Sequence, residues 1–267
     1  MIEKGEPLHS EQTGIPIAPS LEPTIHSAHL LTNKEFYNYR SIGLSFIAIL
    51  LGITAGFIAQ ILTALIGLIT NISFYGIISF EFSSPAQNHL GIGVVIIPII
   101  GATIVGIMAK YGSAGIRGHG IPEAMEQILV NESRIQPRLT FLKPISAAIS
   151  IGTGGPFGAE GPIIATGGAL GSLIGQLLKT SADERKILLA AGAAAGMSAT
   201  FGSPVSSVLL AVELLLFEFK PNSLVPVTLA CVAATGVRIF FVGTEPIFAL
   251  KDILQPSSLA LVIYLLL

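Results

Sequence analysis

The sequence predicts an all-α, polytopic membrane protein whose helices are tilted, broken or re-entrant. Of its 267 residues, 51% are hydrophobic and only 11% are charged, whereas soluble domains carry roughly 25% charged residues. The mean hydropathy is +0.77. Several apolar runs are too short to cross a bilayer or are interrupted by glycine and proline. Interrupted helices at membrane depth are tolerated where the backbone is buried in protein or lines a wet cavity, as in channels and transporters.

Composition divides the chain into two parts. Residues 1–40 are polar and contain several prolines, which predicts a disordered tail. Residues 41–267 form the predicted transmembrane domain, and its last apolar run, residues 257–267, has the form of a helix that is cut off. The net charge of −2 gives no reason to expect nucleic acid as a partner. The single cysteine, Cys231, excludes an internal disulfide.

The first apolar run, Ser41–Phe80, contains no charged residue and is too long for one span of about 20 residues. Two interpretations stay open: one long tilted helix with an apolar loop, or a span followed by a partly embedded segment. A second span covers Leu90–Ala109. A helix that begins at Pro122 and the run Phe141–Ile151 are each too short to cross a membrane.

The second half of the chain contains four more predicted apolar helices, at Ile163–Leu178, Ile187–Phe201, Val205–Phe217 and Ser223–Arg238. In the first two, glycine recurs at every fourth position: Gly167, Gly171 and Gly175, then Gly192 and Gly196. This spacing is typical of the face on which membrane helices pack closely.

Three glycine-containing segments each lead into a helix through a proline: Gly118–Glu123, Gly158–Pro162 and Phe201–Val205. Glycine lets backbone N–H groups turn toward a ligand, and the start of a helix carries about half a positive charge. Such starts could bind an anion without a cationic side chain, although each taken alone is also typical of an ordinary loop-to-helix junction.

Glu160 is the only charged residue between Lys143 and Lys179. A bare charge at mid-membrane costs at least ~3 kcal/mol, so Glu160 must be paired, face a watery cavity or lie at the membrane surface. Ionised, its carboxylate could occupy an anion site at a helix start; protonated, it could swing aside. His119 could donate to an anion or simply be solvated. His119 and Glu123 are only a weak metal pattern, and no metal site is predicted.

These segments resemble the CLC family of voltage-gated chloride channels and proton-coupled chloride transporters. The resemblance is carried, in order and spacing, by Gly118–Glu123, Gly158–Pro162 and Ala190–Pro204 with Val205–Glu213, and it runs from about residue 41 to the last residue. It implies a homodimer with one pore in each subunit, two inverted halves in each subunit, and a chloride site built from helix N-termini near the middle of the membrane.

Carried over by position, Glu160 matches the family's external gating glutamate. The implied anion-binding residues are Gly118, His119, Gly120, Ile121, Pro122, Gly158, Gly161, Pro162 and Ile163. Two positions depart from the family pattern. His119 replaces a serine whose hydroxyl contacts chloride, which bears on the choice between chloride and other anions such as fluoride. Ala159 replaces a basic residue beside the gate.

Two further departures concern coupling and length. Glu213 matches the first residue of a Glu-Glu pair, but Leu214 stands where transporters often carry the inner proton-transfer glutamate, and leucine cannot pass a proton. The resemblance also implies that residues 41–267 correspond to the first inverted repeat and the start of the next helix, so that the chain as given holds half of a pore.

The predicted function is therefore transport of chloride or another small anion through a CLC-type pore in a lipid bilayer, with the cell membrane as the expected location. Leu214 favours a passive channel, and a proton-coupled chloride or fluoride antiporter is the alternative. A subunit that conducts nothing is a third possibility. No cofactor is expected besides the transported ion, and an enzyme is disfavoured because no nucleophile–base pair stands out.

Overall fold

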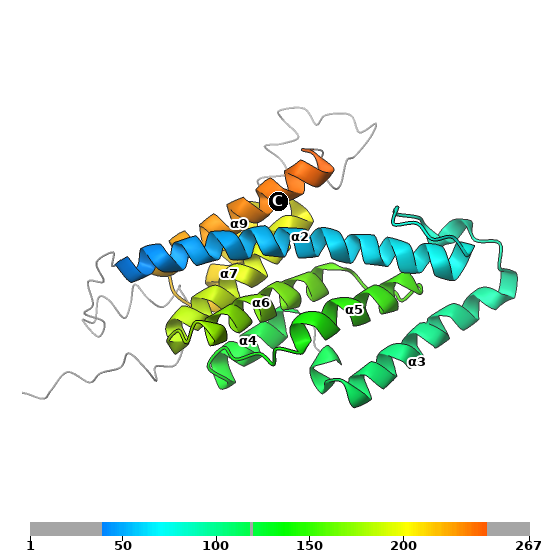
Figure 1. The fold of residues 1–267 in the computed structure, drawn as a ribbon, viewed down its shortest axis with the longest axis horizontal. Helices are drawn as coiled ribbons and strands as arrows, with labels where there is room; N and C mark the ends of the chain where they lie inside the picture. The colour runs from blue at the N-terminus through cyan, green and yellow to red at the C-terminus, as the bar shows by residue number, and fades with distance from the viewer. Residues whose placement is uncertain (1–38, 118–119, 245–267) are drawn as a thin grey trace, which may run out of the picture.

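Helices make up almost all of the regular structure in residues 39–117 and 120–244, which are the residues that the computed structural model describes (Figure 1). The helices are α2 (Tyr39–Tyr75), α3 (Ile96–Tyr111), α4 (Ile121–Val130), α5 (Leu139–Gly152), α6 (Glu160–Leu177), α7 (Ala182–Phe201), α8 (Pro204–Ala211) and α9 (Pro221–Val242). Short 3-10 turns cover Pro85–Gln87, Gly91–Val95 and Ala114–Arg117, and a π-helix, η4, covers Val212–Leu216. The described residues contain no strand, which confirms the all-α prediction.

The long first apolar run is one continuous helix followed by an apolar loop. α2 has 37 residues and is therefore about 55 Å long at 1.5 Å per residue. It runs the length of the molecule and packs against α5, α6, α7 and α9. After Tyr75 the chain leaves the helix, and Asn71 holds the turning loop by donating to the carbonyls of Ser79 (3.0 Å) and Glu81 (2.8 Å).

Three helical segments of the described chain are long and apolar enough to cross a membrane: Arg40–Tyr75, Gly91–Tyr111 and Pro221–Val242. α3, which belongs to the second, lies at the edge of the molecule, and most of its side chains are exposed. Its exposed residues include Ile96, Ile99 and Ile100. An apolar surface of this kind suits contact with lipid, so the chain is an integral membrane protein.

The structure moves several predicted helix boundaries: α5 and α9 are longer at both ends than predicted, and the predicted helix Val205–Phe217 is α8 followed by η4. Three changed helix starts bear on the candidate site and the helices around it. α6 begins at Glu160 rather than at Ile163, so the carboxylate belongs to the first helical residue. α7 begins at Ala182 rather than at Ile187, because Ser181 and Glu184 form a capping box that the apolar pattern does not reveal. α4 begins at Ile121, one residue before Pro122.

Glycine allows α6 and α7 to touch backbone to backbone, as the four-residue spacing predicts. Gly167 and Gly192 face each other, and a Cβ on Gly192 would lie 2.8 Å from the carbonyl carbon of Gly167. Farther along α7, a Cβ on Gly196 would lie 2.8 Å from the carbonyl oxygen of Ile163. Real Cβ atoms do not approach backbone so closely, so each of these positions requires glycine.

The first prediction concerns this contact. We expect Gly192→Ala to lower the free energy of unfolding by about 2 kcal/mol, because the new methyl group forces α6 away from α7. The apparent unfolding temperature in detergent should fall by roughly 5 °C. Gly106→Ala in α3 is the matched control, since a Cβ there has no neighbour within 4 Å and alanine favours a helix. Equal unfolding temperatures for the two variants would contradict the close contact.

Candidate functional site

Two of the three predicted glycine–proline helix starts meet in space, at the beginnings of α4 and α6. Gly120 precedes α4 with φ of +74°, a backbone conformation that favours glycine. A Cβ on Gly120 would lie 2.9 Å from both Cα and the carbonyl oxygen of Gly161. The structure therefore brings Gly120, which directly precedes Ile121 and Pro122, into contact with Gly161, about forty residues farther along the chain.

Neither of these helix starts is capped by a side chain. Gly120 and Ala159 occupy the capping positions of α4 and α6, and neither makes a side-chain hydrogen bond to the helix. The first four N–H groups of a helix have no partner within it, and together they carry partial positive charge. A Cβ on Gly161 would enter open space, with nothing within 4 Å. The two starts thus bring uncapped N–H groups close together, an arrangement that can bind an anion.

The Glu160 side chain turns back along the chain toward Gly158. A Cβ on Gly158 would lie 3.0 Å from Cδ of Glu160 and would overlap its Oε2. Glu160 is half-buried, and within residues 39–117 and 120–244 no hydrogen bond or ion pair holds its carboxylate. The carboxylate therefore lies at the positive end of α6, and no contact with a described residue holds it there.

The remaining predicted anion-binding residues are distributed as follows. Gly118 and His119 lie outside the described residues. Pro162 is half-buried in the first turn of α6, and Ile163 is buried with its carbonyl against Gly196 of α7. Ile163 thus anchors the start of α6 in the core.

The third predicted helix start lies against a different element. Gly202 ends α7 with φ of +63°, and a Cβ there would lie 3.0 Å from Nη1 of Arg238 in α9. Ser203, at the capping position of α8, makes no side-chain hydrogen bond to that helix. The third helix start therefore does not join the other two: Gly120 contacts Gly161 of α6, whereas Gly202 contacts Arg238 of α9.

The two positions that bear on proton coupling lie in the π-helix η4. Glu213 is exposed there, and Leu214 is half-buried. Single π turns inside helices are frequent at functional sites. At the end of η4, Lys186 of α7 donates to the carbonyl of Leu216 at 3.3 Å and pairs with Glu218 at 3.7 Å.

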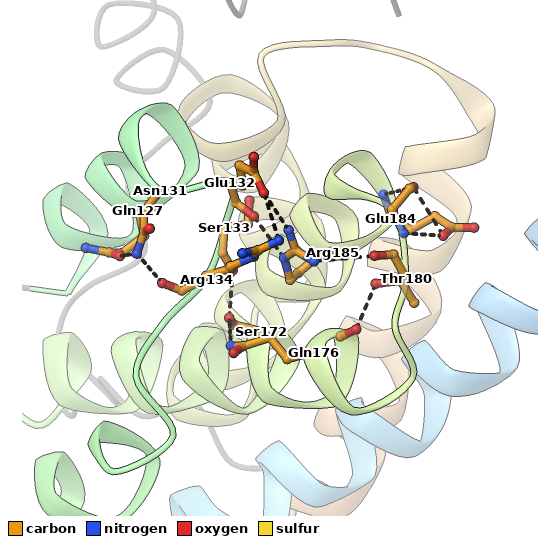
Figure 2. A network of polar contacts seen from close by, with 12 residues as sticks. Gln127, Asn131, Glu132, Ser133, Arg134, Ser172, Gln176, Thr180, Glu184 and Arg185 are labelled. Carbon is orange, nitrogen blue, oxygen red and sulfur yellow. Dashed lines mark hydrogen bonds and ion pairs between the residues drawn. The ribbon is translucent and has the colours of Figure 1, made fainter. Parts of the chain in front are cut away.

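The far end of α4 is fixed by a polar network around the bend between α4 and α5 (Figure 2). Glu132 and Ser133 both have positive φ, of 47° and 60°, which is costly for residues other than glycine. Arg185 of α7 stabilises this bend by donating through Nε to the carbonyl of Glu132 at 2.8 Å. Burial of the Arg185 side chain, which is 5% exposed, makes this a contact inside the protein rather than on its surface.

Two side chains of α6 complete the network. Ser172 accepts from the backbone N–H of Ile135 at 2.8 Å and donates to the carbonyl of Ser133 at 2.6 Å. Gln176 donates to the carbonyl of Ile135 at 2.9 Å. The bend is thus bonded to α6 and α7 at one end of α4 while Gly120 contacts α6 at the other, so the direction of α4 is fixed at both ends.

An ion pair that the sequence did not reveal lies behind the α4 start. Lys143 of α5 pairs with Glu123 in the first turn of α4, and their side chains are 5% and 16% exposed. A cavity of about 10 Å³ separates α4, α5 and α6 here, lined in part by Gly120, Glu123 and Lys143; it has space for about one water molecule. The one sequence feature that could have pointed to this pair is the isolated position of Lys143 in an apolar run. Among the described residues no cluster of three or more potential metal ligands occurs.

The second prediction compares the two glycines that meet. Gly120→Ala should lower the free energy of unfolding by about 2 kcal/mol, since it combines an unfavourable φ with overlap on the Gly161 backbone. Gly161→Ala is the matched control, because its Cβ meets open space. Thermal unfolding of both variants in detergent checks this. A Gly120→Ala protein as stable as Gly161→Ala would show that the two helix starts do not touch.

Comparison with known proteins identifies the family. The sequence profile of the family described as "Voltage gated chloride channel" matches residues 100–267. The chain is 29% identical over 232 residues to chloride channel protein CLC-e of Arabidopsis thaliana, which covers 82% of this chain and 32% of that protein. It is 32% identical over 157 residues to the H(+)/Cl(-) exchange transporter ClcA of Citrobacter koseri, covering 56% of this chain and 32% of that protein.

The fold has a solved relative of the same kind. The crystal structure of a slow cyanobacterial Cl−/H+ antiporter matches with a TM-score of 0.69 and 21% identity, over 86% of this chain and 53% of that one. The chain thus spans about half of the solved protein and about a third of the two curated relatives. With helix starts, fold and sequence profile in agreement, the chain belongs to the voltage gated chloride channel, or CLC, family.

Proposed function

We propose that this protein transports chloride or another small anion across a membrane through a CLC-type pore. The observation that carries the proposal is the meeting of two uncapped helix starts at Gly120 and Gly161. The Glu160 carboxylate lies beside them and has no hydrogen-bond or ion-pair partner among the described residues. Backbone N–H groups at the two starts would bind the anion. Its contacts would come from the sequence-predicted set: Gly118, His119, Gly120, Ile121, Pro122, Gly158, Gly161, Pro162 and Ile163.

Glu160 is the gate in this proposal. When ionised, its carboxylate competes with the anion for the positive end of α6. When it is protonated, that competition ends and the side chain can leave, since no partner among the described residues holds it. Protons thereby open the path without having to cross the protein.

Passive conduction is the favoured mode, because Leu214 cannot transfer a proton and Glu213, its neighbour in η4, is exposed. The second candidate is proton-coupled exchange of chloride or fluoride, which the names of the ClcA relative and of the solved antiporter favour. The full chain in sealed vesicles separates the two modes. A chloride gradient that drives proton uptake supports exchange, and anion flux without proton movement supports a channel.

Assembly and location follow the same family argument and are part of the proposal. We infer a homodimer in the cell membrane, with the apolar faces of α2, α3 and α9 in contact with lipid or with further protein. The mass of the detergent-solubilised protein tests the dimer. A monomer with no anion flux would instead support a membrane subunit that conducts nothing.

The third prediction tests the gate directly. Glu160→Gln imitates the protonated acid, so anion flux through the full chain in liposomes should stay open and depend only weakly on pH. Glu126→Gln is the control, because it removes an exposed carboxylate from α4 without touching the candidate site. If Glu160→Gln keeps the pH dependence of the wild-type protein, Glu160 is not the gate.

The fourth prediction uses Gly158. In Gly158→Ala the new methyl group takes the position of the Glu160 carboxylate, which can move away because it is the end of a flexible side chain. The unfolding temperature should therefore stay within about 2 °C of wild type, a change of less than 1 kcal/mol. Flux should shift toward that of Glu160→Gln. A stable variant with wild-type pH dependence would mean that the carboxylate does not gate from this position.

A further inference from the structure

The Glu123–Lys143 ion pair is unusual because it is buried in an apolar part of the protein. Lys143 is the only charged residue of α5, and its side chain is 5% exposed. Burying a charge in low dielectric is strongly unfavourable unless it is paired and hydrogen-bonded. Replacing such a pair by apolar residues is often neutral for stability, so stability alone does not account for its presence.

Lys143 holds both sides of the turn that leads into α4. Its Nζ donates to the carbonyl of Gly115 at 3.3 Å, before the turn, and pairs with Glu123, after it. Leu139, one helical turn earlier on α5, supports the same segment, since a Cβ on Gly115 would lie 2.7 Å from its Cδ1. Lys143 of α5 therefore contacts the chain at Gly115, before Gly120, and at Glu123, after it.

The pair also lies next to the candidate anion site. Glu123 is in the first turn of α4, and both Glu123 and Lys143 border the small cavity that Gly120 and Ala165 of α6 also line. A carboxylate in the first turn stabilises the helix but repels an anion bound at the same end. The ammonium group of Lys143 cancels that repulsion at contact distance.

We propose that the Glu123–Lys143 pair sets the anion affinity of the site where α4 and α6 begin. Lys143 is a positioning residue for the α4 start, and its charge balances that of Glu123 so that the site keeps the positive potential of the helix ends. This inference rests on the proposed function, because it assumes that the two helix starts bind the anion.

If charge balance matters, removing either partner of the pair should shift the chloride affinity in opposite directions. If the pair only holds the α4 start in place, both changes should weaken binding. A unit charge roughly 10 Å from an ion, at an effective dielectric constant of about 20, changes affinity by about tenfold. Lys143→Met leaves an unpaired carboxylate and should raise the half-saturating chloride concentration about tenfold. Glu123→Gln leaves an unpaired ammonium and should lower it by a similar factor. The double variant should return close to wild type, and Lys143→Arg should stay close to it.

The experiment measures chloride-dependent flux of the full chain in liposomes, with unfolding temperatures of every variant. Glu126→Gln is the matched control: it removes a carboxylate one turn farther along α4, where the side chain is exposed, and should change the half-saturating concentration by less than twofold. Glu123→Gln remains decisive if Lys143→Met does not fold, because the amide oxygen can still accept from Lys143.

The outcomes separate this inference from the proposed function. A wild-type protein that carries chloride saturably, with Glu123→Gln binding it equally or more weakly, overturns the inference and leaves the transport function intact. Weakening in all variants, in proportion to lost stability, assigns the pair a structural role only and also overturns it. A wild-type protein without saturable chloride flux overturns the proposed function and this inference with it.

Discussion

The contact between α6 and α7, with no side chain between the two backbones, is the constraint on which the rest of the structure depends. Gly167 and Gly192 let the helices approach until each meets the other's carbonyl. This places the start of α6 in the core through Ile163, and a second backbone contact, at Gly120 and Gly161, then brings α4 to the same place. The candidate site therefore depends on two contacts of backbone with backbone, which side chains such as Arg185 and Lys143 support from the far end and the near end of α4.

The start of α7 is capped by side chains, whereas the starts of α4 and α6 are not. At the start of α7, Ser181 and Glu184 form a capping box and Arg40 of α2 pairs with Glu184. Close by, burial alone would raise the pKa of Glu218, but its ion pair with Lys186 and other contacts hold that pKa below the usual range. Polar side chains thus cap the start of α7 and pair the charges close to it. At the starts of α4 and α6 the capping positions supply no side-chain hydrogen bond, so the first N–H groups of these two helices have no partner from the capping residue.

The sequence predicted what depends on local pattern and missed what depends on distant partners. Glycine spacing revealed the close face of α6 and α7, and the glycine–proline segments revealed the starts of α4 and α6. Hydrophobic pattern did not locate the start of α7, because its first turn is charged and is set by a cap. Lys143 and Glu123 are twenty residues apart in the chain. They pair because α5 lies against the start of α4, which the periodicity of the sequence does not predict. The meeting of Gly120 with Gly161 likewise required three-dimensional packing.

The length of α2 has a consequence for the surrounding bilayer. An unbroken helix of about 55 Å exceeds a hydrocarbon core of about 30 Å, and its uncharged stretch, which begins at Ser41 and continues to its end at Tyr75, offers no fixed anchoring point along the way. Hydrophobic mismatch of this size is accommodated by tilt. Because α2 packs against α5, α6, α7 and α9, we expect a change in membrane thickness that tilts α2 to be felt by the helices of the core.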